Sequence, residues 1–456
     1  MKKKHSTHSD GAPVPDPNYW LFDLHCHPAL KYFIFKDENL FHPHHVKGGI
    51  FSFEYPLEIY YDAPGAIDGG VGVFVNNHYI PEYNFNDSLL LSKLDSITQA
   101  DLIEQFDFDH APTARNTNAW DKLQLSISHF EDLVKETNAS PLGQYTITIL
   151  DDPKNFSQLK AKYDIVVINA IEGAHHLGRN LALWEYQKNL DYLKTKGFCF
   201  FTLGHFSKNS VVDSAGGIPP SEFFVSAYHT PNPNDQQGLI ADKSPGLQIS
   251  SQVVEYALKK GFLIDLVHSS LKARKEVYKI NRDLARLHGG HGVTVPPKTF
   301  RPLAFTHTGV WDLYSKSENA SWEFSSLLPH YFDVKEIIIS RGIIGLILMN
   351  YWLSGDDSYK LDPIPALVAT IKYVASVAKD VANEFGNLQP EEYNDFVGIG
   401  TDLDGFTHVP DDYRESSLLS GLAAELLPHF DNDPTVVKKI LHENAMRVFK
   451  EACGAI

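Results

Sequence analysis

The stretch Val166-Val-Ile-Asn-Ala-Ile-Glu172 decides the predicted fold, because it is an almost unbroken apolar run that ends on a carboxylate. A strand with one exposed face alternates apolar and polar residues, whereas a strand buried on both faces, as in a parallel sheet, is apolar almost throughout. We therefore predict a parallel strand over Val166–Ile171, with Glu172 just beyond its carboxyl end.

Seven other short apolar stretches are predicted to be strands of the same kind. They are Leu21–His25, Val71–Val75, Phe198–Leu203, Phe262–Val267, Leu303–Thr306, Ile343–Met349 and Val397–Gly400. Helical periodicity lies between several of them, at Leu181–Lys196, Ser250–Lys260 and Ala366–Phe385. Strands that alternate with helices form a parallel sheet, and eight such units predict a (β/α)8 barrel of the TIM type, an α/β fold. Residues Tyr145–Leu150 are a ninth candidate strand.

The chain has 456 residues, which is much longer than the roughly 250 residues of a bare barrel. We therefore predict long inserted loops, among them Asn209–Leu247, which is rich in Pro, Gly, Asn and Asp. Residues 1–18 are expected to form a disordered N-terminal arm, and residues 19–456 a single elaborated barrel domain.

The composition argues against several classes of protein. With 40 Lys and Arg against 57 Asp and Glu, the formal charge is −17, which disfavours nucleic acid as a partner. No apolar run is long enough to span a membrane. The three cysteines are far apart and match neither a disulfide framework nor a CxxC zinc site. The basic, Pro-rich N-terminus lacks the apolar segment of a secretory signal, so we expect a cytoplasmic protein, although a chain trimmed of its leader would look the same.

Five of the 22 histidines fall at the ends of predicted strands. His25 and His27 close the first strand, and residues two apart in an extended chain point to the same side. Single residues that bind metals or transfer protons follow five other strands: Glu172, His205, His268, His307 and Asp402. Because the carboxyl ends of barrel strands meet at one mouth, we expect these side chains to share one site.

The residue types in this expected site suit amide hydrolysis assisted by two divalent metals. A carboxylate such as Glu172 can bridge two metal ions about 3.5–4 Å apart, with two histidines completing each coordination shell. Asp402 would then take the proton from the bridging water and pass it to the leaving amine. His205 is left to stabilise the oxyanion of a tetrahedral intermediate.

Six motifs follow one another in a fixed order from about Phe22 to Phe449. They are Ile171-Glu-Gly-Ala-His175, Leu203-Gly-His205 with Asn209, Leu263-Ile-Asp-Leu-Val-His268, Phe305-Thr-His307, Gly398-Ile-Gly-Thr-Asp-Leu-Asp-Gly405 and Ile440-Leu-His-Glu-Asn-Ala-Met-Arg-Val-Phe449. Each motif is short, but together they resemble the membrane (renal) dipeptidase family of the amidohydrolase superfamily.

The resemblance implies a site with two zinc ions, in which Glu172 bridges and His268 and His307 bind one of the ions. It implies that His205 holds the substrate or the transition state and that Asp402 transfers a proton. Asn209 is a further candidate for substrate binding. The resemblance also implies a small-molecule or dipeptide substrate and a homodimer.

The first strand departs from the family pattern. The family normally has His-x-Asp there, whereas this chain has His25-Cys-His27. His-x-His occurs elsewhere in the superfamily, so metal binding is expected to survive. The site nevertheless loses one negative charge, which predicts a weaker hold on the first ion or a different metal.

The segment after His307 also departs from the pattern. The family has an Arg-Asn pair there, whose arginine binds the terminal carboxylate of the peptide. The nearest match here is Glu318-Asn319, and Lys316 is the only Lys or Arg between His307 and Lys335. Lys316 offers a point charge without the two-pronged geometry of a guanidinium. We hypothesise a substrate that lacks a free carboxylate at that end, or that carries a cation near Glu318.

Two alternative functions remain open from the sequence. One is a non-peptidase amidohydrolase that acts on another small amide, an ester or a lactone. The other is an inactive relative kept as a binding protein, against which the intact ligand set and Asp402 argue, because an unused site would be free to lose them.

Glu318→Arg is expected to shift substrate preference toward dipeptides with a free C-terminal carboxylate, because a guanidinium binds a carboxylate through two hydrogen bonds. The measurement is the ratio of kcat/KM for a dipeptide and for its C-terminal amide, in the wild type and the variant. An unchanged ratio would show the hypothesis about Glu318 to be wrong.

Overall fold

The structure is a computed structural model, and it describes only part of the chain. The described residues are 18–30, 70–80, 82, 117–139, 146–215, 237–240, 249–287, 300–317, 324–355, 362–405, 413 and 416–454. The predicted arm 1–18, apart from Asn18, and the predicted substrate residue Glu318 lie outside these ranges, as do parts of the predicted loop Asn209–Leu247. That residues 19–456 form one domain stays a prediction.

Eight parallel strands close into a barrel. Each strand pairs with its neighbour in the order β2-β1-β9-β8-β7-β6-β5-β4, and pairing between β2 and β4 completes the ring. The strands are β1 Leu21–Cys26, β2 Val71–His78, β4 Ile165–Glu172, β5 Phe200–Thr202, β6 Leu263–Asp265, β7 Leu303–Thr308, β8 Ile343–Leu346 and β9 Val397–Ile399. The predicted (β/α)8 barrel is therefore confirmed, and so are the positions of its eight strands, several of which are shorter than expected.

The ninth candidate strand exists but is not a member of the closed barrel. It is β3, Ile147–Ile149, and it pairs with residues 165–167 of β4. The strand β5 pairs with residues 170–172 of the same β4 strand. Thus β3 extends the sheet at the N-terminal end of β4 and leaves the ring of eight intact.

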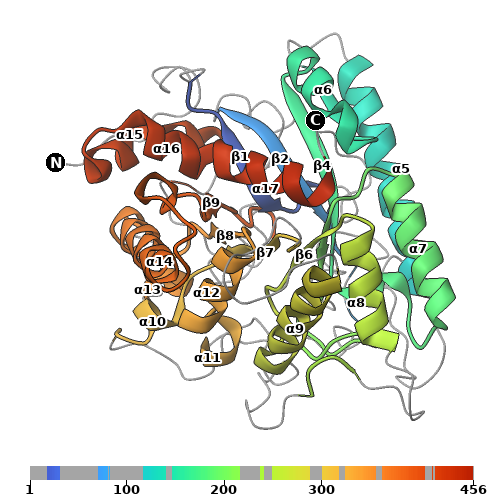
Figure 1. Cartoon of the computed structure of the whole chain (residues 1–456). Helices are drawn as coiled ribbons and strands as arrows, with labels where there is room; N and C mark the ends of the chain where they lie inside the picture. Colours follow the sequence, from blue (N-terminus) through green and yellow to red (C-terminus); the bar gives the residue numbers. More distant parts are fainter. Residues whose placement is uncertain are drawn as a thin grey trace, which may run out of the picture.

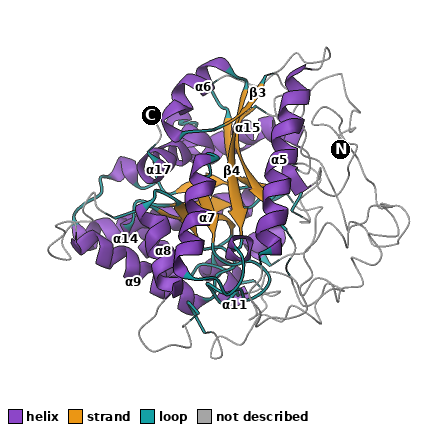
Figure 2. Ribbon diagram, turned by 90° about the vertical axis from the view of Figure 1, so that its right-hand side faces the viewer, coloured by secondary structure: helices purple, strands orange, loops and turns teal. Residues whose placement is uncertain are grey.

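Helices surround the barrel, as Figures 1 and 2 show. Those described are α5 Asn118–Ala139, α6 Phe156–Lys162, α7 Leu183–Thr195, α8 Ile249–Lys259, α9 Leu271–Leu287, α10 Trp311–Tyr314, α11 Phe324–Leu327, α12 Tyr331–Ile339, α13 Asn350–Ser354, α14 Ile364–Phe385, α15 Leu422–Leu426, α16 Pro434–Lys438 and α17 Asn444–Cys453. The three predicted helices correspond to α7, α8 and α14. Within the described ranges, no helix combines the length and the apolar character needed to cross a bilayer.

The long helix α14 shows how the sequence sets one of these elements. Pro363 precedes its first turn, where a missing backbone N–H costs nothing. Its buried side chains recur at helical spacing, including Leu367, Ile371 and Val374, and so form one apolar face toward the barrel. The helix ends at Gly386, whose φ of 66° is a left-handed conformation that glycine adopts without strain.

The helix α17 fills the N-terminal end of the barrel interior. A buried cluster joins inward-facing strand residues such as Phe22 and Phe200 to Ala445, Val448 and Phe449 of α17. The Phe449 ring lies 6.2 Å from the ring of Phe22 and 6.4 Å from that of Phe200, measured between centroids. The apolar half of the barrel is thus closed, which leaves the carboxyl ends of the strands for polar side chains.

Phe449→Ala is expected to lower the free energy of unfolding by about 3–5 kcal/mol, because truncating a fully buried aromatic ring leaves a cavity. Trp184→Ala is the matched control: Trp184 is 64% exposed, so its loss is expected to change the stability by about 0.5 kcal/mol or less. Urea denaturation of both variants checks this. Equal losses would contradict the assigned role of Phe449.

Candidate metal centre

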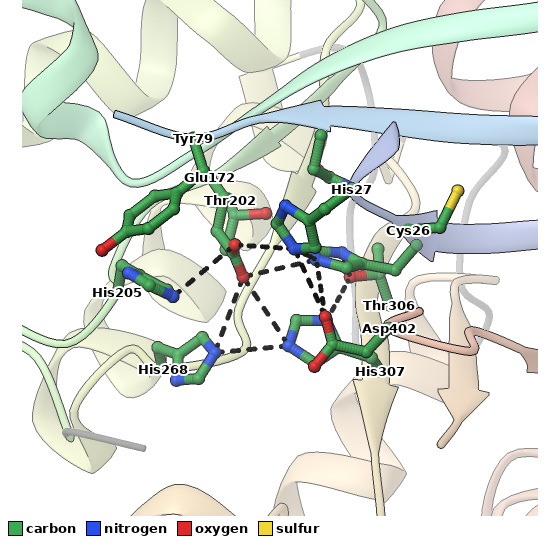
Figure 3. A network of polar contacts seen from close by, with 12 residues as sticks. Cys26, His27, Tyr79, Glu172, Thr202, His205, His268, Thr306, His307 and Asp402 are labelled. Atoms are coloured by element: carbon green, nitrogen blue, oxygen red, sulfur yellow. Dashed lines mark hydrogen bonds and ion pairs between the residues drawn. The ribbon is translucent and has the colours of Figure 1, made fainter. Parts of the chain in front are cut away.

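The predicted site residues meet at the carboxyl ends of the strands, around the carboxylate of Glu172 (Figure 3). All seven, including Asp402, are 6% exposed or less. Five imidazole Nε2 atoms approach the two carboxylate oxygens of Glu172. To Oε1 the distances are 3.4 Å from His25, 3.6 Å from His268 and 3.7 Å from His307, and to Oε2 they are 3.2 Å from His27 and 3.6 Å from His205.

A bulge in β1 turns His25, and with it His27 just beyond the end of the strand, toward this cluster. Asp23 pairs with Phe74 and Cys26 pairs with Asn76, so three steps along β1 oppose two along β2. One extra residue reverses the alternation of side chains. His25 therefore points into the barrel like Phe22 and Leu24, which precede it, and His27 follows two residues later. In Figure 3 the sulfur of Cys26 points away from the cluster.

A similar bulge lies between Phe305 and Thr308, in the segment that contains His307. Phe305 pairs with Ile344 and Thr308 pairs with Leu346, so β7 also carries one residue more than its neighbour. The interior cluster of the barrel contains Ala304, two residues before Thr306. After the shift, Thr306 and His307 both reach the polar end of the interior, where each contacts other members of the site.

Asp402 reaches the site because β9 lies beside β1. The Asp402 backbone N–H donates to the His25 carbonyl at 2.8 Å, and the His27 N–H donates to the Leu403 carbonyl at 2.9 Å. Asp402 Oδ1 then lies 3.3 Å from His27 Nε2 and 3.8 Å from His25 Nε2. Asp402 has a φ of 54° and His268 a φ of 60°. Such left-handed conformations are costly for residues with a Cβ and occur often at functional sites.

Two pairs of imidazole nitrogens are spaced like two ligands of the same metal ion. His25 and His27 bring their Nε2 atoms to 3.1 Å from each other, and His268 and His307 bring theirs to 3.2 Å. Two nitrogens that each lie about 2.0–2.1 Å from one tetrahedral zinc ion are about 3.3 Å apart. Three overlapping sets of side chains, each with its ligand atoms within 4.8 Å, meet the requirement for a metal site: His25, His27 and Asp402; His25, Glu172 and His307; and Glu172, His205 and His268.

Thr306 holds one histidine of each pair in the form that binds metals. Its hydroxyl donates to Asp265 Oδ2 at 2.7 Å, so its single hydrogen is used. The same oxygen lies 2.8 Å from His25 Nδ1 and 3.2 Å from His307 Nδ1, and therefore accepts hydrogen bonds from both. When Nδ1 carries the hydrogen of a neutral imidazole, the lone pair is on Nε2, which faces Glu172.

Asp265 is fixed in turn by its neighbours. Besides Thr306 Oγ1, it accepts hydrogen bonds from Thr202 Oγ1 at 2.7 Å, from the Thr306 N–H at 3.0 Å and from the Val267 N–H at 3.2 Å. Burial raises the pKa of Asp265, and the charge of His25 and these donors oppose the rise. The carboxylate thus links β5, β6 and β7 directly beneath the cluster.

The electrostatics of the cluster favour cations. Burial alone would lower the pKa of His27, but the carboxylates of Glu172 and Asp402 raise it to about 10. Burial alone would raise the pKa of Glu172, but the nearby histidines, His205 foremost, hold it well below its usual range. The site therefore attracts positive charge strongly, and protons and metal ions compete for the same lone pairs.

His205 differs from the other imidazoles, because its Nδ1 atom lies 3.0 Å from a second buried carboxylate, that of Glu82. Burial alone would lower the pKa of His205, but Glu172 and Glu82 raise it. Nothing in the sequence marked Glu82, which lies in the long gap between two predicted strands. Asp265 did carry a signal, because a carboxylate inside an apolar strand needs buried hydrogen-bond partners.

The predicted substrate residues are less closely grouped. The Asn209 side chain donates to the Leu203 carbonyl at 2.9 Å and accepts from the Val211 and Val212 N–H groups, so it fixes the conformation of its own loop. Lys316 is exposed just beyond α10. Their roles in substrate binding stay predictions, as does that of Glu318, which lies outside the described residues.

The fold is shared with solved metallopeptidases. The structure of the dipeptidase AC, a metallopeptidase of family M19, matches with a TM-score of 0.65 and 16% identity over 96% of this chain and 100% of that chain. A metallopeptidase from Rhodobacter sphaeroides, liganded with a phosphinate mimic of the dipeptide L-Ala-D-Ala, matches with a TM-score of 0.63 and 16% identity over 95% and 99%. An amidohydrolase from Pseudomonas aeruginosa matches with a TM-score of 0.57 and 12% identity over 96% and 98%.

The family itself is shown by the sequence. The profile of the membrane dipeptidase family (peptidase family M19) matches residues 62–455. The match includes Glu172, His205, His268, His307 and Asp402 and begins after the histidine pair of β1. Because it spans most of the chain, this protein belongs to the membrane dipeptidase family and is a metal-dependent, dipeptidase-like hydrolase.

Proposed function

We propose that this protein hydrolyses the amide bond of a dipeptide or a similar small substrate at a centre for two divalent metal ions, with zinc as the expected metal. The observation that carries the proposal is the pair of Nε2–Nε2 contacts at 3.1 and 3.2 Å on one shared carboxylate. In this proposal His25 and His27 hold one ion, His268 and His307 hold the other, and Glu172 bridges.

The chain's own residues divide the remaining work. When bound, the ions lower the pKa of water and polarise a carbonyl group. Asp402 directs Oδ1 at the same centre and is placed to take a proton from water and return it to the leaving nitrogen. His205 presents Nε2 on the opposite side of Glu172, where it can bind the carbonyl oxygen of the substrate and the oxyanion that develops from it.

The segment after His307 supports a second candidate substrate. The chain has Glu318 where the family carries an arginine, and the nearby Lys316 is exposed. A blocked dipeptide or another small amide is therefore the alternative substrate. The relative from Rhodobacter sphaeroides binds a mimic of L-Ala-D-Ala, so dipeptides with a D-residue belong in any substrate screen. Assembly as a homodimer, proposed from the family alone, is checked by light scattering of the purified protein.

Asp402→Asn is expected to lower kcat by about 10²–10⁴-fold while the metal content stays at two equivalents, because the amide is a poor proton carrier. The measurement is hydrolysis of L,L-, L,D- and C-terminally blocked dipeptides and of non-peptide amides, together with metal analysis. Chelation is expected to abolish the activity, and zinc to restore it.

Asp404→Asn is the matched control for this experiment, since Asp404 is equally buried and lies only two residues away. Its variant is expected to keep far more activity than the Asp402 variant. A purified wild type without bound metal, or full activity in Asp402→Asn, would contradict the proposed function.

Thr306→Val is expected to weaken metal affinity by about 10–100-fold, because it removes the acceptor that orients His25 and His307. Both metal positions are expected to weaken together, since each loses support for one histidine. Thr306→Ser keeps the hydroxyl and is the control. Competition titration with a zinc chelator measures both affinities, and loss at one position alone would argue against the shared role of Thr306.

A further inference from the structure

Glu82 is a buried carboxylate beside the centre, and nothing in the reaction described above uses it. Its side chain is almost fully buried and accepts four hydrogen bonds. Oε1 accepts from His205 Nδ1 at 3.0 Å, from the Phe206 N–H at 3.0 Å and from the Ser207 N–H at 3.4 Å. Oε2 accepts from the Tyr79 hydroxyl at 2.6 Å.

These contacts favour the ionised carboxylate over the acid. Burial alone would raise the pKa of Glu82, but the charge of His205 and the surrounding donors hold it below its usual range. An ionised carboxylate only accepts hydrogen bonds, so in each of these contacts the partner atom carries the hydrogen. The Nδ1 atom of His205 therefore carries a hydrogen.

The backbone that leads to Glu82 is fixed by two histidines that follow β4. His175 Nε2 donates to the Ile80 carbonyl at 2.7 Å, and His176 Nε2 accepts from the Ile80 N–H at 2.8 Å. His176 can accept there because its other nitrogen, Nδ1, donates to the Gly173 carbonyl at 2.7 Å. The two histidines thus bind both the N–H and the carbonyl of Ile80, two residues before Glu82.

Gly173 allows the backbone to turn sharply between Glu172 and these two histidines. Its φ is 98°, and a Cβ added there would lie 2.4 Å from His175 Nδ1. This turn therefore sets the position of His175 and His176 relative to Glu172. The position of Glu82 relative to Glu172 is set by a short chain of direct contacts.

The Tyr79 ring completes the enclosure of His205. It packs edge-on against the imidazole, with 4.5 Å between the ring centroids. The centroid of the Phe206 ring lies 3.7 Å from that of the same imidazole. Aromatic contact limits sliding of the ring, while the Glu82 contact prevents a flip that would exchange Nδ1 and Nε2.

We propose that Glu82 is a positioning residue for the reaction: it holds Nδ1 of His205 so that only Nε2 faces the substrate and Glu172. This inference rests on the proposed function of the site and assigns Glu82 no contact with the reacting atoms. His205 Nε2 lies 3.6 Å from Glu172 Oε2, on the side of the cluster away from Asp402. Glu82 thus sets the direction of the group that binds the substrate's oxygen.

The test is a double-mutant cycle in the metal-loaded enzyme, with Glu82→Gln, His205→Ala and the double variant. Glu82→Gln is expected to lower kcat by about 10–100-fold, as loss of an orienting carboxylate does, with unchanged metal content. In the His205→Ala background the same substitution is expected to cause no further loss, because its effect acts through His205. Glu131→Gln, which alters a carboxylate that pairs with Lys196, is the control and is expected to match the wild type.

A second readout does not depend on turnover. Nitrogen NMR of the histidine side chains is expected to show the hydrogen of His205 on Nδ1 in the wild type and a changed distribution in Glu82→Gln. This spectrum tests the contact even if the wild type hydrolyses none of the substrates offered, an outcome that would count against the proposed function alone.

Three results would overturn the role of Glu82: unchanged kcat in Glu82→Gln, losses that multiply in the double variant, or loss of bound metal, which would make Glu82 a support for a metal ligand instead. If Glu82→Gln fails to fold by circular dichroism, Tyr79→Phe replaces it in the cycle. That variant removes one hydrogen bond to Glu82, and its smaller loss of kcat is expected to disappear when His205 is absent.

Discussion

Five imidazoles and the carboxylates of Glu172 and Asp402 share one buried space inside the barrel, and much of the local structure follows from that constraint. Nitrogen lone pairs 3.1 and 3.2 Å apart repel unless a hydrogen or a metal ion lies between them. The bulges in β1 and β7 and the left-handed backbone of His268 and Asp402 each carry a conformational cost. Metal binding to these side chains, as the proposed function requires, would offset those costs.

The candidate metal ligands could be picked out from the sequence because each lies at or near the end of an apolar run. Glu172 and His268 need only the rule that the carboxyl ends of parallel strands meet. The bulges were not predictable, since one extra residue in a strand leaves no mark on an apolar pattern. Without its bulge, β1 would have turned His25 away from the cluster, so the two-residue spacing of His25 and His27 does not by itself explain why both face it.

The supporting residues were harder to find than the ligands. Thr306 lies within a predicted strand, where a β-branched residue is common, so nothing marked its hydroxyl as a shared partner of two histidines. Glu82 depends on contacts between loops that are far apart in the sequence. The strand β3 formed at its predicted position. Whether it would belong to the ring could not be predicted, because that depends on how the other strands pair with β4.

The filling of the barrel by α17 has a consequence for biosynthesis. The chain emerges from the ribosome N-terminus first, so the nine strands of the described residues are made before Phe449. Until then the rings of Phe22 and Phe200 face an interior that lacks its final layer. All residues of the candidate metal centre are therefore synthesised before the helix that completes the apolar half of the barrel.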